Sequence, residues 1–146
     1  MLPREYRCTS VTETQSFAAD LANSLSTGIV IALIGDLGSG KTTFAQGFAE
    51  GLGISEHVGS PTFKLVSEYD GQKGKLIHVD AYRLEGIDDF LNIGGADILA
   101  TPRAIILIEW GDKLESILPP DAIRISFKRV LDVENERLIS IKGLKT

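Results

Sequence analysis

The feature that most constrains this chain is a glycine-rich loop that directly follows an apolar run. Residues 29–34 (IVIALI) are all apolar, which is typical of a strand buried on both faces of a sheet. The segment that follows, 35–42 (GDLGSGKT), matches the phosphate-loop pattern G-x-x-x-x-G-K-[ST] at every fixed position. Such a match arises by chance in about one chain in a hundred of this length. Because a helical stretch, 41–52, comes next, the pattern predicts an α/β fold that binds phosphate.

The chemistry of phosphate binding explains the residue types in this loop. Glycines let consecutive backbone N–H groups turn towards phosphate oxygens, and the following helix points its positive N-terminal end at the same anion. We expect the Lys41 side chain to face solvent and reach the β- and γ-phosphates, and the Thr42 hydroxyl to ligate Mg²⁺. The candidate nucleotide contacts in this segment are Asp36, Leu37, Gly38, Ser39, Gly40, Lys41, Thr42 and Thr43.

Two acidic residues are candidates for the second metal ligand, which lies at the tip of a neighbouring strand in P-loop enzymes. Glu109 follows the fully apolar run 104–108, whereas Asp80 follows the half-alternating run 76–79. Because ligands lie at the carboxyl ends of central strands, Glu109 is the expected metal ligand. Asp80 is expected to orient the attacking water or to bind the outer shell of the metal. The alternative for Asp80 is a solvated turn carboxylate paired with Arg83.

A hydroxyl-bearing turn, Ser60-Pro61-Thr62, follows the helix after the loop. Thr62 is a candidate contact to Mg²⁺ or to the γ-phosphate, as in switch loops. The alternative is an ordinary turn that enters a strand, since serine and proline are common in turns.

The remaining pattern predicts further strands and helices around this centre. Residues 12–15 (TETQ) fit a capping box that opens a helix ended by Gly28. Alternation at 63–69 and 75–82, around a polar turn, predicts a β-hairpin. The other predicted elements are an edge strand at 4–10, a helix at 87–99 interrupted by Gly94-Gly95, strands at 104–108, 122–130 and 138–141, and a short helix at 112–118. Residues 1–146 are expected to form a single domain, because this length leaves no room for a second core.

Composition and charge argue against several classes of protein. With 15 Lys and Arg against 20 Asp and Glu, the net charge is −5, which disfavours autonomous binding of DNA or RNA. The single cysteine, Cys8, excludes an internal disulfide and a cysteine-rich zinc site. The first residues lack the apolar stretch of a secretory signal, and no run approaches the roughly 18 apolar residues of a membrane span. A cytoplasmic protein without a membrane segment is therefore expected.

Three further side chains near these motifs have simple expected roles. His78 is expected to be a satisfied structural histidine, since one histidine alone makes no catalytic set. Trp110 is expected to pack in the core, because a lone aromatic beside a strand end is usually core. Arg83 either stabilises phosphoryl charge or pairs with Asp80 or Glu85.

Four motifs, in this order and at these distances, resemble one family. They are the loop 35–43, SPTF at 60–63, HVDAYRL at 78–84 and IEW at 108–110. The chain resembles the TsaE family, formerly YjeE, whose members are bacterial ATPases of tRNA threonylcarbamoyladenosine biosynthesis. The resemblance runs from the N-terminal helix to the C-terminal hairpin. It implies an α/β, three-layer fold of the P-loop NTPase type, with a central mixed sheet and β-hairpin additions.

The resemblance also implies cofactors and partners. Family members bind ATP or ADP with Mg²⁺. They act with two subunits of the actin-like ATPase superfamily, of the TsaB and TsaD type, which make the threonylcarbamoyl transfer complex. ATP hydrolysis, which is expected to be slow without these partners, is thought to reset that complex between turnovers. The protein alone is expected to be a monomer that meets tRNA only indirectly.

Roles for individual residues follow from the same resemblance. The implied catalytic residues are Lys41, Asp80 and Thr62, and the implied Mg²⁺ ligands are Thr42 and Glu109. Two positions outside the loop, Thr12 at the helix start and Val133 in the last turn, align with adenine-side contacts.

Two other classes of function compete with an ATPase subunit. A small-molecule or nucleotide kinase would carry an arginine-bearing lid, whereas the arginines here are scattered and no lid insertion is visible. A GTP-dependent switch would carry an Asn-Lys-x-Asp motif that reads the base, and the sequence has none.

Overall fold

The computed structural model describes residues 4–56, 58–59 and 65–144. The described strands form one sheet of seven, in the order β1-β7-β6-β2-β5-β4-β3. The strands are β1 (Arg4–Cys8), β2 (Ile29–Ile34), β3 (Val66–Gly71), β4 (Gly74–Asp80), β5 (Ala104–Glu109), β6 (Ile123–Arg129) and β7 (Arg137–Lys142). The helices are α1 (Val11–Ser24), α2 (Lys41–Gly51), α3 (Ile87–Asn92), α4 (Gly95–Leu99) and the 3₁₀ helix η1 (Gly111–Ile117).

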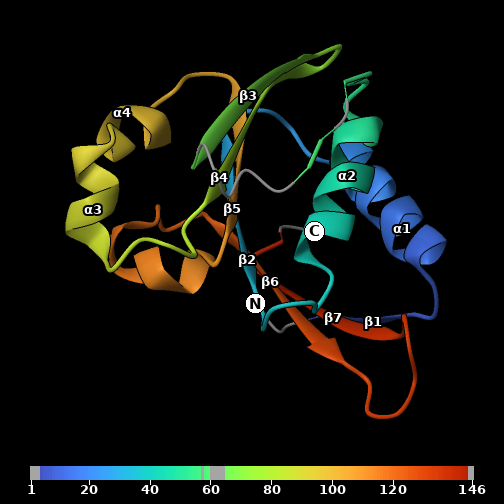
Figure 1. The fold of residues 1–146 in the computed structure, drawn as a ribbon. Coiled ribbons are helices and arrows are strands. Elements are labelled where there is room, and N and C mark those ends of the chain that lie inside the picture. Colours follow the sequence, from blue (N-terminus) through green and yellow to red (C-terminus); the bar gives the residue numbers. More distant parts are fainter. Residues whose placement is uncertain (1–3, 57, 60–64, 145–146) are drawn as a thin grey trace.

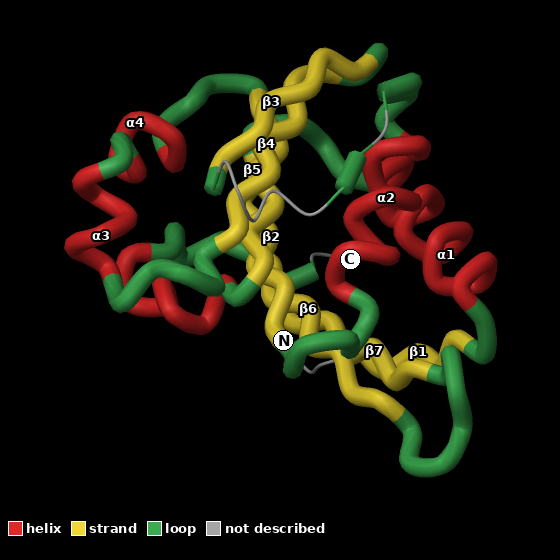
Figure 2. The backbone as a smooth tube through the Cα atoms, viewed as in Figure 1, coloured by secondary structure: helices red, strands yellow, loops and turns green. Residues whose placement is uncertain are grey.

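The sheet is mixed and lies between two layers of helices. Strand β2 is parallel to both of its neighbours, β5 and β6, and β4 is parallel to β5. The antiparallel pairs are β1–β7, β6–β7 and β3–β4, so hairpins extend the parallel centre on both sides. Helices α1 and α2 cover one face, while α3, α4 and η1 cover the other (Figures 1 and 2). The predicted three-layer α/β fold with hairpin additions is confirmed.

The two apolar runs are buried because their side chains alternate between two cores. Along β2, Ile31 and Leu33 join the core under α1 and α2, whereas Val30 and Ala32 join the core under the other layer. A strand covered on both faces must be apolar at every position, which explains the unbroken run. This burial fixes the carboxyl end of β2, from which the glycine-rich loop departs.

Helices α1 and α2 touch through backbone rather than side chains at Gly47. A methyl group added to Gly47 would lie 2.3 Å from the Gln15 carbonyl oxygen and 2.5 Å from the Gln15 Cα. Gly51, one turn later, has the same relation to Ala19, at 2.6 Å from its oxygen. The helix that carries the loop is therefore held tightly against α1.

The start of α1 differs from the sequence prediction. The capping residue is Ser10, whose Oγ accepts a hydrogen bond from the Glu13 N–H at 3.1 Å, and Glu13 Oε1 accepts from the Thr9 N–H at 2.8 Å. The box placed at Thr12–Gln15 was wrong, because Ser10 has the extended backbone of a cap and Thr12 lies within the helix. The hydrogen bond from Thr9 lowers the pKa of Glu13.

Several element boundaries also differ. The hairpin strand β3 begins at Val66, and β4 ends at Asp80 rather than Tyr82. The helix predicted at 87–99 is two short helices, because Gly94, with φ +90°, separates α3 from α4. Among the residues that the structure describes, no helix has the length and apolar character needed to cross a membrane.

Candidate functional site

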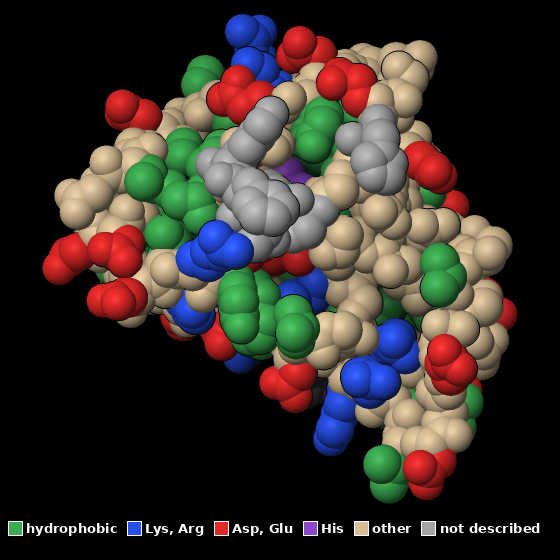
Figure 3. Space-filling model, viewed as in Figure 1, with side chains coloured by type: hydrophobic (Ala, Val, Ile, Leu, Met, Phe, Trp, Pro, Cys, Tyr) green, Lys and Arg blue, Asp and Glu red, His purple; other side chains and the backbone are tan. Residues whose placement is uncertain are grey.

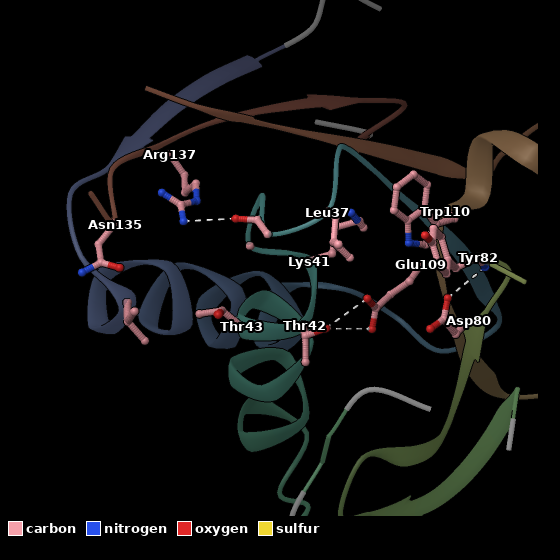
Figure 4. A pocket seen from close by; sticks show the side chains of 13 residues that line it. Leu37, Lys41, Thr42, Thr43, Asp80, Tyr82, Glu109, Trp110, Asn135 and Arg137 are labelled. Carbon is pink, nitrogen blue, oxygen red and sulfur yellow. Dashed lines mark hydrogen bonds between the residues drawn. The ribbon is translucent and has the colours of Figure 1, made fainter. Parts of the chain in front are cut away.

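A pocket of about 300 Å³ opens at the carboxyl ends of the central strands, where the glycine-rich loop leaves β2 (Figure 4). This is the edge of the sheet at which α/β proteins bind ligands. Its lining comes from the loop, α2, the ends of β4 and β5, the start of α1 and the β6–β7 turn. The residues are Val11, Leu37, Gly38, Gly40, Lys41, Thr42, Thr43, Asp80, Tyr82, Glu109, Trp110, Asn135 and Arg137.

The loop has the backbone geometry of a phosphate cradle. Gly40 precedes α2 with φ +109°, a conformation that residues with a side chain rarely adopt. The first N–H groups of α2 have no acceptor within the helix, so they are available to an anion at this helix end. The predicted strand–loop–helix unit is thus present.

Lys41 is buried, not facing solvent as the sequence analysis expected, and it is only 5% exposed. Its Nζ donates hydrogen bonds to the carbonyl oxygens of Gly35 at 2.5 Å and Asp36 at 2.8 Å. The same nitrogen lies 4.2 Å from the centre of the Trp110 ring. Burial lowers the pKa of Lys41, an effect opposed by the nearby carboxylates, Glu109 first among them. The ammonium group is therefore held inside the loop.

Thr42 and Glu109 form the centre of the polar site. The Thr42 hydroxyl donates to Glu109, at 3.1 Å from Oε1 and 3.4 Å from Oε2. On its other side, Glu109 Oε2 lies 2.7 Å from Nε2 of His78. Glu109 is only 3% exposed and His78 is fully buried. The structure thus brings together the two residues that were predicted to ligate Mg²⁺.

Asp80 lies beside Glu109, because the two residues are register partners at the ends of β4 and β5. Its Oδ1 accepts a hydrogen bond from the Tyr82 N–H at 2.9 Å. Asp80 is 4% exposed, so it is not the solvated carboxylate of the alternative prediction. Its place in the pocket is compatible with either of the roles predicted for it, since each needs a carboxylate near the phosphates.

The β6–β7 hairpin brings arginine side chains to the loop. Arg137 Nη2 donates to the Gly38 carbonyl oxygen at 3.2 Å, and its side chain packs against Gly40. The Arg129 guanidinium lies near Gly38. Figure 3 shows Lys and Arg side chains gathered towards this end of the face, although the chain as a whole is acidic. The pocket lining thus carries two cations, Lys41 and Arg137, on the loop side and two carboxylates, Asp80 and Glu109, at the strand ends.

Trp110 does more than fill the core. It packs against the core under η1, as expected, but it also lines the pocket and contacts the Tyr82 ring at 4.9 Å between centres. Its backbone φ of +61° turns the chain sharply after Glu109. Lys113 Nζ donates to the carbonyl oxygens of Tyr82 and Leu84, which ties η1 to the segment after Asp80.

The comparison with known families gives this site its context. The family model described as "Threonylcarbamoyl adenosine biosynthesis protein TsaE" matches residues 8–139. The chain belongs to the TsaE family. The matched residues of this TsaE-family chain include the whole loop and both acidic strand ends.

Two known TsaE proteins and one solved structure are similar to this chain over most of their length. The tRNA threonylcarbamoyladenosine biosynthesis protein TsaE of Bacillus subtilis is 40% identical over 139 residues, covering 95% of this chain and 86% of the relative. The protein of the same name from Treponema pallidum is 37% identical over 132 residues, covering 89% and 96%. The solved structure of YdiB from Bacillus subtilis has a TM-score of 0.77 and 36% identity, covering 97% of this chain and 86% of that one.

Not every residue expected at the site lines the pocket. Asp36 contributes its carbonyl oxygen to Lys41, and the loop residue Ser39 is buried. The two adenine-side candidates, Thr12 and Val133, are not among the lining residues, whereas their near neighbours Val11 and Asn135 are. The predicted switch residue, Thr62, lies outside the residues that the structure describes.

Sequence reasoning missed several residues that the structure places here. Asn135 and Arg137, which line the pocket, could not be singled out from the sequence because the turn before β7 contains no recognisable motif. Tyr82 was named only as one position of the HVDAYRL motif. His78 was expected to be satisfied, but Nδ1 finds no hydrogen-bond partner among the described residues. The signal available in the sequence was a histidine two residues before one candidate carboxylate, Asp80.

The residues present fit a magnesium nucleotide. Mg²⁺ prefers oxygen ligands, and a hydroxyl and a carboxylate oxygen lie side by side at Thr42 and Glu109. Loop N–H groups, Lys41 and Arg137 supply the donors that phosphate needs.

Proposed function

We propose that this protein binds ATP and ADP with Mg²⁺ and hydrolyses ATP for the threonylcarbamoyladenosine modification of tRNA. In this proposal it resets a threonylcarbamoyl transfer complex that it forms with two actin-like ATPase subunits, of the TsaB and TsaD type, in the cytoplasm. Alone it is a single-domain monomer of low activity. The observation that carries the proposal is the Thr42–Glu109 contact at the mouth of the glycine-rich loop in a TsaE-family chain.

Each side chain of the site has a distinct task in this proposal. The loop N–H groups and Lys41 bind the phosphates, and Lys41 exchanges its loop carbonyls for phosphate oxygens. Thr42 and Glu109 hold the metal, which when bound neutralises charge on the phosphates. Asp80 positions the attacking water. Thr62 senses the γ-phosphate, as its place in the family motif suggests.

Steady-state hydrolysis with and without the partners tests this function. We expect slow phosphate release by the protein alone and faster release when both partner subunits and tRNA are added. We also expect no tight tRNA binding by the isolated protein, because its net charge of −5 gives no long-range attraction for RNA. Transfer of phosphate to a small-molecule acceptor instead of water would support a kinase. Salt-sensitive, tight tRNA binding by the protein alone would contradict the partner-dependent arrangement.

The two acidic residues should differ in their effect on metal dependence. We expect Glu109→Ala to reduce the gain in ADP affinity that Mg²⁺ provides by at least about tenfold, and Asp80→Ala to reduce it less. The reason is that Glu109 contacts the Thr42 hydroxyl, whereas one Asp80 oxygen is already bonded to the Tyr82 N–H. Calorimetric titration of ADP with and without Mg²⁺ measures both effects.

A matched control is Glu115→Ala, which removes a half-exposed carboxylate paired with Arg124 outside the pocket. This variant should keep the full effect of Mg²⁺. Loss of the metal effect in Asp80→Ala alone would show that the two carboxylates have the opposite roles.

A further inference from the structure

His78 is the fully buried titratable residue at this site for which the proposed chemistry has no use. It lies near the carboxyl end of β4, two residues before Asp80, and is not among the residues that line the pocket. Its Nε2 is 2.7 Å from Glu109 Oε2, whereas Nδ1 has no partner among the described residues. A histidine kept only for stability would have both ring nitrogens bonded, because an unpaired buried nitrogen costs stability.

We propose that His78 is a positioning residue that holds the Glu109 carboxylate towards Thr42 and, through it, sets the affinity of the site for Mg²⁺. This inference rests on the nucleotide function proposed above. It concerns a residue that reaches neither nucleotide nor metal, since Glu109 stands between His78 and the pocket.

The direction of the hydrogen bond follows from the chemistry of the pair. An ionised carboxylate can only accept, so the proton of this contact belongs to Nε2 of His78. Nε2 then donates to Oε2, while the Thr42 hydroxyl donates most closely to Oε1, at 3.1 Å. Both carboxylate oxygens of Glu109 are therefore held by hydrogen bonds: Oε2 by His78 on β4, and Oε1 by Thr42 on α2.

The strand geometry explains why His78 can do this. Glu109 pairs in register with Asp80, and His78 pairs with Leu107, so the His78–Glu109 contact is a diagonal one between neighbouring parallel strands. The side chains of His78, Asp80 and Glu109 share the sheet face that α2 covers. Hydrogen bonds behind a ligating carboxylate orient it, and their loss typically reduces metal affinity about 10- to 100-fold.

The test compares two replacements of similar length. His78→Gln keeps an amide N–H near the position of Nε2, whereas His78→Met fills the space without a donor. For both variants and the parent protein, ADP affinity is measured by calorimetry with Mg²⁺ and with excess EDTA, and unfolding by urea is followed in parallel. We expect His78→Met to lose about 10- to 100-fold of the affinity gain due to Mg²⁺, with metal-free ADP affinity unchanged within about twofold. His78→Gln should stay within about threefold of the parent.

The outcomes separate this inference from the function on which it rests. If the parent protein does not bind ADP, the proposed function fails. If the parent shows a Mg²⁺ effect and His78→Met keeps it in full, His78 has no positioning role. The same holds if His78→Met lowers ADP affinity in EDTA as much as it lowers ADP affinity with Mg²⁺. Should His78→Met fail to fold, loss of the Mg²⁺ effect in a folded His78→Gln would overturn the proposal. In a Glu109→Ala background, His78→Gln and His78→Met should show the same residual Mg²⁺ effect, and a difference between them would also overturn it.

Discussion

Replacing Lys41 with alanine should reduce ATP turnover by on the order of 10²–10³-fold while the protein stays folded. The ammonium is the one side-chain cation inside the described part of the loop, and it is already desolvated and aimed across the cradle. A preorganised charge of this kind stabilises the charge that develops on the phosphates more than the bound substrate. Turnover of the purified variant, with the partner subunits present, measures the effect.

The fold should survive because the Lys41 charge does not stabilise it. Burial lowers the pKa of Lys41, so the unfolded chain holds this proton more tightly than the folded one. The protonated Lys41 side chain therefore destabilises the folded state at pH values below its folded-state pKa. This destabilisation disappears as the pH rises above the ordinary pKa of lysine. The alanine variant loses this cost together with the hydrogen bonds from Nζ to Gly35 and Asp36, two effects of opposite sign, so we expect its urea unfolding at pH 7 to match the parent within about 1 kcal/mol. Lys142→Ala, at an exposed position on β7, is the matched control and should leave turnover unchanged. Turnover at the parent rate in the Lys41 variant would refute the assignment of the loop.

Replacing Gly47 with alanine should destabilise the protein by about 3 kcal/mol. Alanine alone favours a helix over glycine by roughly 1 kcal/mol, but here its methyl group would overlap the backbone of Gln15. Backbone atoms cannot rotate away as a side chain can, so α1 and α2 must separate along their whole contact. Urea denaturation gives the free energy of unfolding, with the slope of the transition as a check on two-state behaviour.

The control for Gly47 is Gly86→Ala, which tests the same substitution where there is room. Gly86 has extended backbone, with φ of 171°, and no atom within 4 Å of an added methyl group. Its effect should stay within about 0.5 kcal/mol. A Gly47→Ala variant as stable as the parent would mean that the two helices are not held by this contact.

The parts of the fold that sequence predicts best are those fixed by local pattern. Unbroken apolar runs identified β2 and β5, since only a strand covered on both faces needs them. The start of α1 was misplaced because both Ser10 and Thr12 stand three residues before Glu or Gln, and only the backbone conformation at Ser10 separates them. Local pattern also predicted an interruption at Gly94-Gly95, and the structure has separate helices, α3 and α4, on its two sides.

The residues of the candidate site were predictable from sequence, but the contacts between side chains on different elements were not. The loop residues follow from the phosphate-loop motif. Asp80 and Glu109 follow from their positions at the ends of predicted parallel strands. The contact of His78 with Glu109 depends on the register between β4 and β5, which no local pattern contains. The contact of Lys41 with the Trp110 ring likewise joins segments far apart in the sequence, and the positive φ of Trp110 has no signal in the local pattern.

The order of the sheet has a consequence for how the protein is made. The loop departs from β2, yet both strands that flank β2 come from the later half of the chain, at Ala104–Glu109 and Ile123–Arg129. A ribosome therefore releases the glycine-rich loop long before the strands that hold it in place exist. Pairing over such sequence distances closes slowly. The nascent chain should gain the ability to bind nucleotide late, after β6 has emerged, so ligand binding marks a chain in which both strands that flank β2 have been made.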